Sequence, residues 1–142
     1  MKFWDSSALV PLIANEENTD YCLRVLGDDP HILIWCLSGV EVVEALCRRL
    51  RDGVMTEEEF RKTKEELRIV LEHAAEIAAI EKVRARALRL LETHPLRAAD
   101  ACQLAAALVS SKEDPQRLAM ICFDERLKKA AMKEGFAVNP GC

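Results

Sequence analysis

The sequence predicts an α/β fold, a three-layer α/β/α sandwich around a mainly parallel central sheet, with an added helical hairpin. Short apolar runs alternate along the chain with longer amphipathic segments, as in strand–helix–strand units. The run HILIWC at 31–36 is almost continuously apolar, which is typical of a strand buried on both faces. The chain has 142 residues, half of them hydrophobic, so we expect one domain spanning 1–142.

The first third of the chain is predicted to hold two strands and two short helices. Residues 2–5 read as a strand, and Ser7 is placed to cap the helix that follows. Pro11 is expected near the start of that helix, where a missing N–H is best tolerated. A second short helix over 18–26 ends at the turn signal GDDP and leads into the strand 31–36.

Two consecutive helices then form the expected hairpin. One covers 37–53 and stops at Gly53, and the other runs from Thr56 to about Leu71. Each begins with the spacing of a capping box. The two boxes are Ser38 with Glu41 and Thr56 with Glu59.

The second half of the chain continues the alternation. The segment 75–92 is predicted to be mostly helical, although its start could be a short strand. The remaining expected elements are a helix within 94–111 entered after Pro95, a strand at 117–123, a helix at 124–135 closed by Gly135, and a last short strand at 136–140.

Composition narrows the classes of function. A net charge of −4 and a pI near 5.5 argue against binding nucleic acid through a broad basic surface, but not against a nucleic-acid enzyme with an acidic site. No apolar run approaches the roughly 20 residues that span a bilayer, and the N-terminus does not resemble a signal peptide. The six cysteines form no C-x-x-C pair, so we expect free, mostly buried thiols in a cytoplasmic protein without membrane contact.

Four acidic residues lie at notable positions in the predicted elements: three come shortly after strands and one lies within an apolar helix. Asp5 ends the first strand, Glu41 lies in the first turn after the second, and Asp124 follows the strand AMICF directly. Carboxyl ends of parallel strands meet at one edge of a sheet, which is where ligands bind in open α/β folds. Asp100 lies inside a helix among alanines, where a carboxylate needs a partner.

Each acid also has an ordinary structural explanation. Asp5 could be a turn residue, Glu41 could only complete its capping box, and Asp124 could cap the following helix. Asp100 could pair with Arg97, one helical turn away. Three acids at one edge and a fourth among alanines nevertheless fit a single site better than four separate coincidences.

The chemistry of such a site is restricted by repulsion between its charges. Two carboxylates about 4 Å apart repel by roughly 4 kcal/mol at an effective dielectric near 20, so a cluster takes up protons or binds cations. Oxygen ligands without histidine or thiolate suit Mg²⁺ or Mn²⁺. His31, His73 and His94 are scattered and show no metal-ligand spacing, so we expect them to be structural or exposed. A carboxylate-bound Mg²⁺ usually retains waters and phosphate oxygens, which points to phosphoryl chemistry.

Four segments together resemble the PIN domain, specifically the small VapC-type toxins of bacterial and archaeal toxin–antitoxin pairs. The segments are FWDSSALVPL, SGVEVVEALCRR, LRAADACQLAAAL and ICFDERLKKAA, in the family's order and over nearly the whole chain. The resemblance places the family's acidic quartet on Asp5, Glu41, Asp100 and Asp124. The family also has a residue with a small hydroxyl side chain after the first acid, and the resemblance places it on Ser7 in preference to Ser6. Glu44 lies one turn after Glu41 on the same helix face, and local spacing leaves both open, although the segment match favours Glu41.

The sequence departs from many relatives at Cys122, where they carry threonine or serine two residues before the last acid. The resemblance implies a Mg²⁺- or Mn²⁺-dependent endoribonuclease, with Asp5 and Asp100 as the foremost metal ligands and Ser7 hydrogen-bonded to a carboxylate or to water. It further implies an RNA substrate, a VapB-type antitoxin and a homodimer. The hairpin from about Ser38 to Leu71 could supply a groove for the antitoxin or could be an ordinary packed helix pair.

Basic residues that could hold RNA lie on three segments. Arg97 is the most informative, because it precedes Asp100 by three positions. The others are equally consistent with solvated helix faces: Arg48, Arg49, Arg51, Arg126, Lys128 and Lys129.

Two other functions remain open. Another Mg²⁺-dependent phosphohydrolase or phosphotransfer domain would place an acceptor aspartate at a strand end. DSSAL, however, lacks the second aspartate of a haloacid-dehalogenase-like phosphatase, and HILIWC ends without the acceptor of a response-regulator receiver. A PIN-like RNA-associated binding module without catalysis is the alternative from a different class.

Overall fold

Four short parallel strands form the central sheet of the computed structural model, which describes all residues 1–142. Their order across the sheet is β3-β2-β1-β4. The strands are β1 (Lys2–Trp4), β2 (Ile32–Trp35), β3 (Ala75–Ile77) and β4 (Met120–Ile121). The predicted parallel sheet is therefore confirmed, and the segment 75–92 does begin with a strand.

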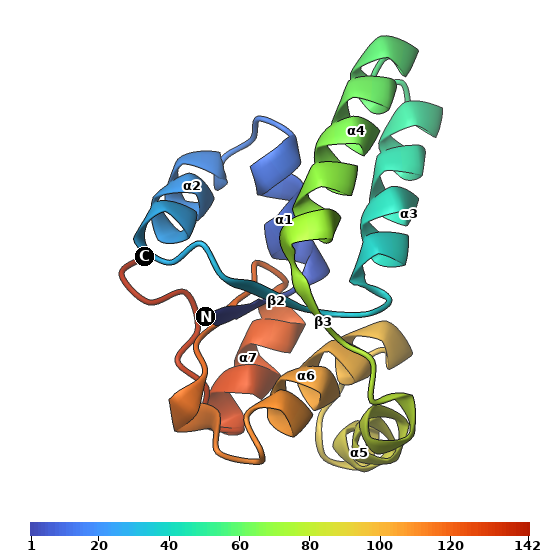
Figure 1. The fold of residues 1–142 in the computed structure, drawn as a ribbon. Coiled ribbons are helices and arrows are strands. Elements are labelled where there is room, and N and C mark those ends of the chain that lie inside the picture. Colours follow the sequence, from blue (N-terminus) through green and yellow to red (C-terminus); the bar gives the residue numbers. More distant parts are fainter.

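Seven helices cover the sheet in two layers, which confirms the three-layer sandwich (Figure 1). On one face lie α1 (Ser6–Ile13), α2 (Thr19–Asp28), α3 (Ser38–Arg51) and α4 (Glu57–His73). On the other lie α5 (Ile80–Thr93), α6 (Ala98–Ser110) and α7 (Glu125–Lys133), with a 3-10 turn at Pro115–Arg117 between α6 and β4.

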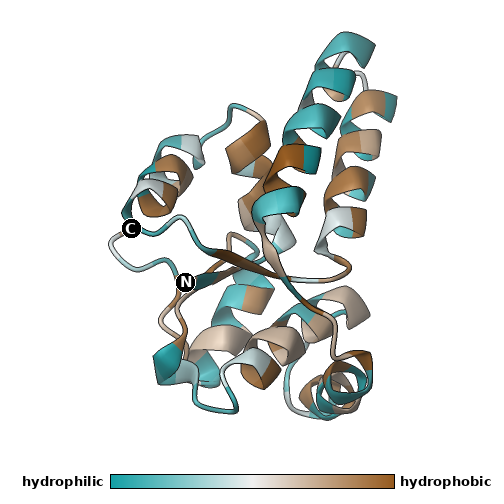
Figure 2. Ribbon diagram, in the orientation of Figure 1, coloured by the Kyte–Doolittle hydropathy of each residue, from teal (hydrophilic) through white to brown (hydrophobic).

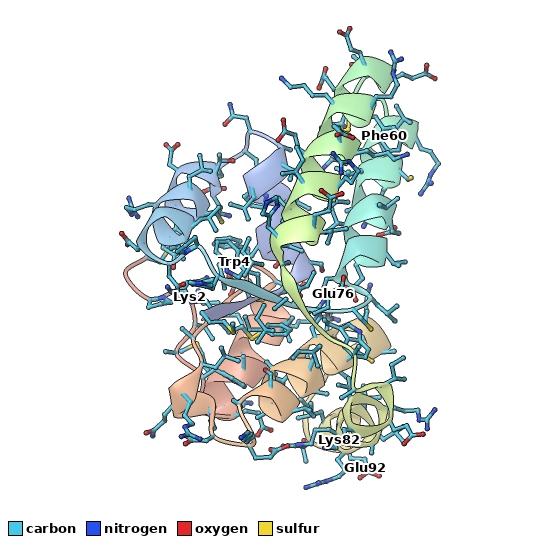
Figure 3. All side chains as sticks on the ribbon, in the orientation of Figure 1. Lys2, Trp4, Phe60, Glu76, Lys82 and Glu92 are labelled. Atoms are coloured by element: carbon cyan, nitrogen blue, oxygen red, sulfur yellow. The ribbon has the colours of Figure 1, made fainter.

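Alternation along each strand divides the apolar core into two halves. Trp4 and Ile34 pack among α1–α4, whereas Phe3 and Trp35 pack among α5–α7. Trp4 is labelled between the sheet and these upper helices in Figure 3. Both faces of β2 are buried, as its continuous apolar run predicted. In Figure 2 the ribbon of β2 is accordingly brown, whereas that of α4 is mostly teal.

The hairpin of α3 and α4 extends beyond the sheet (Figure 1). Its turn is made by Gly53, whose φ of +71° is readily adopted by a residue without Cβ. Thr56 caps α4 by accepting a hydrogen bond from the backbone N–H of Glu59, as predicted. The first capping box was predicted wrongly. Ser38 lies within α3, and its hydroxyl contacts Gln103 of α6 instead.

Two features of α1 also differ from the prediction. The residue that caps it is Asp5, two positions before Ser7. Pro11 lies in the second half of the helix, not near its start, so α1 lacks one hydrogen-bond donor there. The helix ends at Ile13, two residues later.

The predicted last strand is reduced to one bridge. Val138 pairs with Met120 in parallel, but Asn139 then adopts a φ of 49° and turns the chain away. The side chain of Asn139, in place of a continued strand backbone, forms the next hydrogen bonds to this part of the chain. It accepts from the Cys122 N–H at 2.9 Å and donates to the Cys122 carbonyl at 2.7 Å.

The remaining expectations concern membranes and thiols. No helix is long and apolar enough to cross a bilayer. All six cysteines are free, and Cys22 and Cys122 are buried. The other four are partly or fully exposed, so the expectation of mostly buried thiols is wrong, although the two buried thiols do act as small packing groups.

Candidate acidic site at the carboxyl edge of the sheet

The candidate site lies where the strand order reverses. The chain adds β2 and β3 on one side of β1 and then returns to place β4 on the other. Asp5 follows β1 directly, and its backbone N–H donates to the Ile121 carbonyl of β4 at 3.0 Å. Reversal points of this kind leave a crevice at the carboxyl ends of the strands, which makes this edge the expected position of a ligand site.

All four predicted acids line one cavity at this edge, with a volume of about 620 Å³. They come from four parts of the sequence: the end of β1, the first turn of α3, the first turn of α6, and the residue before α7. The cavity is lined by Asp5, Ser6, Ser7, Val10, Glu41, Val42, Glu44, Ala45, Arg48, Arg97, Ala99, Asp100, Asp124, Glu125 and Arg126.

Asp5 is held most firmly, with 2% of its surface exposed. Its Oδ2 accepts a hydrogen bond from the Ser7 backbone N–H at 3.0 Å and another from the Ser7 hydroxyl. The Ser7 oxygen in turn accepts from the Phe123 N–H at 2.9 Å. Ser7 therefore joins the end of β1 to the segment that follows β4, and orients Asp5 through its side chain.

Cys122 occupies the position of the expected hydroxyl. Its Sγ lies 3.7 Å from Oδ2 of Asp5 and 3.6 Å from the Asp124 carbonyl oxygen. Burial raises the pKa of this thiol strongly, so it remains protonated at neutral pH. A thiol is a weak donor, and this one supports Asp5 less strongly than a hydroxyl would.

Asp124 and Asp100 both lie at helix N-termini. Asp124 caps α7 by accepting from the Leu127 N–H at 2.9 Å, so its ordinary structural explanation is correct and compatible with a place in the cavity. Asp100 lies within α6 between Ala99 and Ala101, as predicted, and belongs to the first turn of the helix. It forms no ion pair with Arg97, although the guanidinium is near enough to oppose the rise in its pKa.

The structure separates the two glutamates of α3. Glu41 is half-buried, and its Oε2 accepts a hydrogen bond from Nε2 of Gln103 at 2.8 Å. Glu44 is exposed and forms an ion pair with Arg48, with 2.8 Å between Oε2 and Nη2. Burial raises the pKa of Glu41, and the nearby charges of Asp5 and Asp100 add to the rise.

The electrostatics of the cavity are unfavourable in the absence of a cation. None of the four acids forms an ion pair. Burial raises the pKa of Asp5 and of Glu41, and neighbouring carboxylates add to both shifts. Burial, followed by the charges of Asp124 and Asp5, raises the pKa of Asp100 to about 6. The site therefore favours protons or cations over four free negative charges.

The basic residues considered earlier divide into two groups. Arg97, Arg126 and the paired Arg48 line the cavity, and so could meet a phosphate at its mouth. Arg49 is engaged with Glu16 at 2.7 Å. Arg51, Lys128 and Lys129 do not line the cavity.

The donor chemistry of the cavity fits a hard divalent cation. Its acids supply only carboxylate oxygens, and no histidine or thiolate lines it. As placed, however, no three acidic, histidine or cysteine side chains lie close enough to share one ion. Mg²⁺ commonly takes one or two carboxylates and completes its shell with waters and substrate phosphate, and the four acids suffice for that arrangement.

One residue of the site escaped prediction. Gln103 is fully buried one turn after Asp100 on α6, and it contacts Glu41 across the cavity wall. The signal was a lone amide in the otherwise apolar run ACQLAAAL. Its partner could not be identified from the sequence, because 62 positions separate the two residues.

Two solved structures share the architecture of this chain. A toxin–antitoxin complex from Klebsiella pneumoniae has a TM-score of 0.63 and 18% identity, over 87% of each chain. FitAcB from Neisseria gonorrhoeae has a TM-score of 0.66 and 15% identity, over 97% of this chain and 96% of its own. No curated protein matches the chain. Residues 2–133 match the family described as PIN domain, and this match assigns the chain to the PIN domain family.

Proposed function

We propose that this protein is a metal-dependent endoribonuclease that hydrolyses RNA phosphodiester bonds, and that it is the toxin of a VapBC-type toxin–antitoxin pair. The observation that carries the proposal is the convergence of Asp5, Glu41, Asp100 and Asp124 in one cavity without a single ion pair among them. PIN domains are generally nucleases, which supports the same reaction class.

The proposed cofactor is Mg²⁺ or Mn²⁺, held by Asp5 and Asp100 with Glu41 and Asp124 completing the site. Such an ion supplies Lewis acidity that lowers the pKa of a water molecule and neutralises charge on a phosphate. The protein's own contribution is orientation. Ser7 fixes one oxygen of Asp5, and the N–H of Leu127 fixes one oxygen of Asp124, so both carboxylates enter the cavity already positioned.

The proposed substrate is RNA, whose phosphates must approach a cavity rich in negative charge. Arg97 and Arg126 line the cavity without a carboxylate partner, so both are free to pair with a phosphate. Arg97 is the preferred contact, because it immediately precedes the helix that carries Asp100.

The proposed protein partners are a VapB-type antitoxin and a second copy of the chain. The neighbouring solved structures include a toxin–antitoxin complex, which supports an antitoxin partner. A second cavity of about 590 Å³ lies between the end of α1 and the hairpin and includes Ile13, Val54 and Met55. Its lining is mixed, with four apolar and six polar or charged residues, and we propose this surface for the antitoxin. The free thiols agree with the cytoplasmic location that we propose.

A non-catalytic RNA-binding module is the second candidate, and one observation favours it. No three potential metal ligands are close enough to share an ion as the side chains lie. Under this alternative the cavity would bind RNA or a partner without cleaving it.

The test is cleavage of a labelled RNA pool by antitoxin-free protein in Mg²⁺, Mn²⁺ or EDTA, with Asp5→Asn as the inactive variant and Glu65→Gln as the matched control. We expect metal-dependent cutting by the wild type and the control only. Equal cutting by Asp5→Asn would refute the site. Folded wild type that binds RNA but cuts none of it would favour the binding module. Release of phosphate from p-nitrophenyl phosphate, without RNA cleavage, would indicate another phosphohydrolase.

A further inference from the structure

Gln103 is the one amide side chain that contacts an acid of the cavity. It lies on α6 with none of its surface exposed, between the apolar neighbours Cys102 and Leu104. Burying an amide costs free energy unless its polar atoms are hydrogen-bonded. The contacts that satisfy Gln103 therefore indicate why an amide is suited to this position.

Both partners of the Gln103 amide lie on α3. Nε2 donates to Oε2 of Glu41 at 2.8 Å and to Oγ of Ser38 at 3.0 Å. The Ser38 hydroxyl also approaches Oε1 of Gln103 at 3.4 Å. Ser38 is itself fully buried, so water cannot replace Gln103 as the hydrogen-bond partner of its hydroxyl.

This arrangement ties together two helices that each deliver an acid. Glu41 lies in the first turn of α3, and Asp100 lies in the first turn of α6, one turn before Gln103. The hydrogen bond to Glu41 occupies Oε2, the oxygen that faces α6. The donor is neutral, so it stabilises the ionised carboxylate without cancelling its charge. An arginine in the same place would form an ion pair and compete with a cation.

We propose that Gln103, anchored by Ser38, is a positioning residue that holds the Glu41 carboxylate toward Asp5 and Asp100 in the orientation that binds a divalent cation. This inference rests on the proposed function, in which Glu41 is a metal ligand. Residues that hold metal ligands through a hydrogen bond typically contribute about 10–100-fold to metal affinity.

The test measures Mn²⁺ affinity by electron paramagnetic resonance on full-length, antitoxin-free protein, together with melting temperature. Gln103→Met keeps the length of the side chain and removes the donor, so we expect affinity to fall by about tenfold. Ser38→Ala removes the anchor but leaves the bond to Glu41 intact, and we expect a loss of roughly threefold or less. A Gln103→Met variant that melts lower but binds Mn²⁺ like the wild type would show a purely structural role and overturn the proposal.

A double-mutant cycle identifies the group through which Gln103 acts. In a Glu41→Gln background, Gln103→Met should change Mn²⁺ affinity by less than about twofold, because the carboxylate that Gln103 orients is already absent. Equal losses in both backgrounds would overturn the proposal.

A structural readout separates this inference from the proposed function. Crystal structures of metal-free wild type and Gln103→Met should show the Glu41 carboxylate displaced in the variant. An unmoved carboxylate would overturn the role of Gln103, whatever the protein's activity. A wild type that binds no Mn²⁺ would refute the metal site, and the position of Glu41 would still decide whether Gln103 orients it.

Discussion

The acids of the cavity and the acids of the hairpin surface carry the same charge in opposite surroundings. On α4, Glu65 and Glu72 both pair with Arg68, and the hydrogen bond from Arg68 lowers the pKa of Glu65. In the cavity, Asp5 and Asp100 have no ion-pair partner, and burial raises the pKa of each. The acids of α4 are neutralised by an arginine three or four positions away in the sequence. The acids of the cavity come from distant parts of the sequence and are brought together by the fold.

The negative charge of the cavity is therefore not balanced by the protein's own side chains, unlike that of the hairpin surface. Four carboxylates without counter-charges reduce the stability of the fold unless something binds them. Strained or unfavourable groups of this kind are typical of functional sites. Changes in the cavity should therefore reduce activity while sparing or raising stability, and changes on the hairpin should have small effects on both.

Substitutions of the cavity acids should change the rate of RNA cleavage more than any other property. Asp100→Asn should lower the rate of RNA cleavage by about 10³-fold, because a carboxylate that the proposed mechanism uses directly is lost. Glu65→Gln should leave the rate within about twofold of the wild type, since its carboxylate only pairs with an arginine on the surface. Single-turnover cleavage of one labelled RNA checks both, and a comparable loss in the two variants would contradict the distinction.

The next effect distinguishes the two glutamates of α3. Glu41→Gln should reduce cleavage by about 10²-fold, because this side chain faces Asp5 and Asp100. Glu44→Gln should have an effect of less than about threefold, because Glu44 is exposed and bound to Arg48. The same assay at saturating Mn²⁺ measures both. The reverse order of effects would assign the site acid to Glu44.

A smaller effect is expected on stability and its dependence on pH. The pKa of Asp100 is about 6 in the folded protein, against an ordinary value of 3.8. Below about pH 4 the group is protonated in both states and contributes nothing. Between about pH 4 and 6 the unfolded chain releases its proton first, so the free energy of unfolding falls as pH rises, and above about pH 6 this loss is complete.

Asp100→Asn removes this penalty. After allowance for solvent screening of a half-exposed group, the metal-free variant should melt roughly 3 °C above the wild type at pH 7 and equal it near pH 4. Thermal unfolding followed by the fluorescence of the buried Trp4 and Trp35 provides the measurement. A variant less stable than the wild type at pH 7 would contradict the proposed repulsion.

The smallest effect is expected on the hairpin. Arg68→Ala removes both ion pairs of α4, but all three side chains are more than half exposed. We expect the melting temperature to change by less than about 2 °C, and the difference to fade in 1 M salt. A larger, salt-independent change would mean that Arg68 also packs against the hairpin through its aliphatic part.

Much of the fold followed from local patterns. The apolar run 31–36 predicted a doubly buried strand, and Gly53 and Thr56 predicted the turn and cap of the hairpin. The errors arose where a side chain had two possible partners. Ser38 has the spacing of a cap, yet its hydroxyl is bonded to Gln103 across the core. Residues 136–140 have a strand-like composition, but Asn139 ends the pairing after a single bridge.

Local sequence was enough to predict that acids follow β1 and β4, because a residue directly after a strand must lie at that strand's carboxyl end. The packing of the helices then brings Asp100 and Glu41 into the same cavity, with Glu41 hydrogen-bonded to Gln103, whereas Glu44 at the same cavity is exposed and paired with Arg48. These contacts connect elements far apart in the sequence. They depend on how α3 and α6 pack on opposite faces of the sheet, and the spacing of residues within one helix carries no information about that packing.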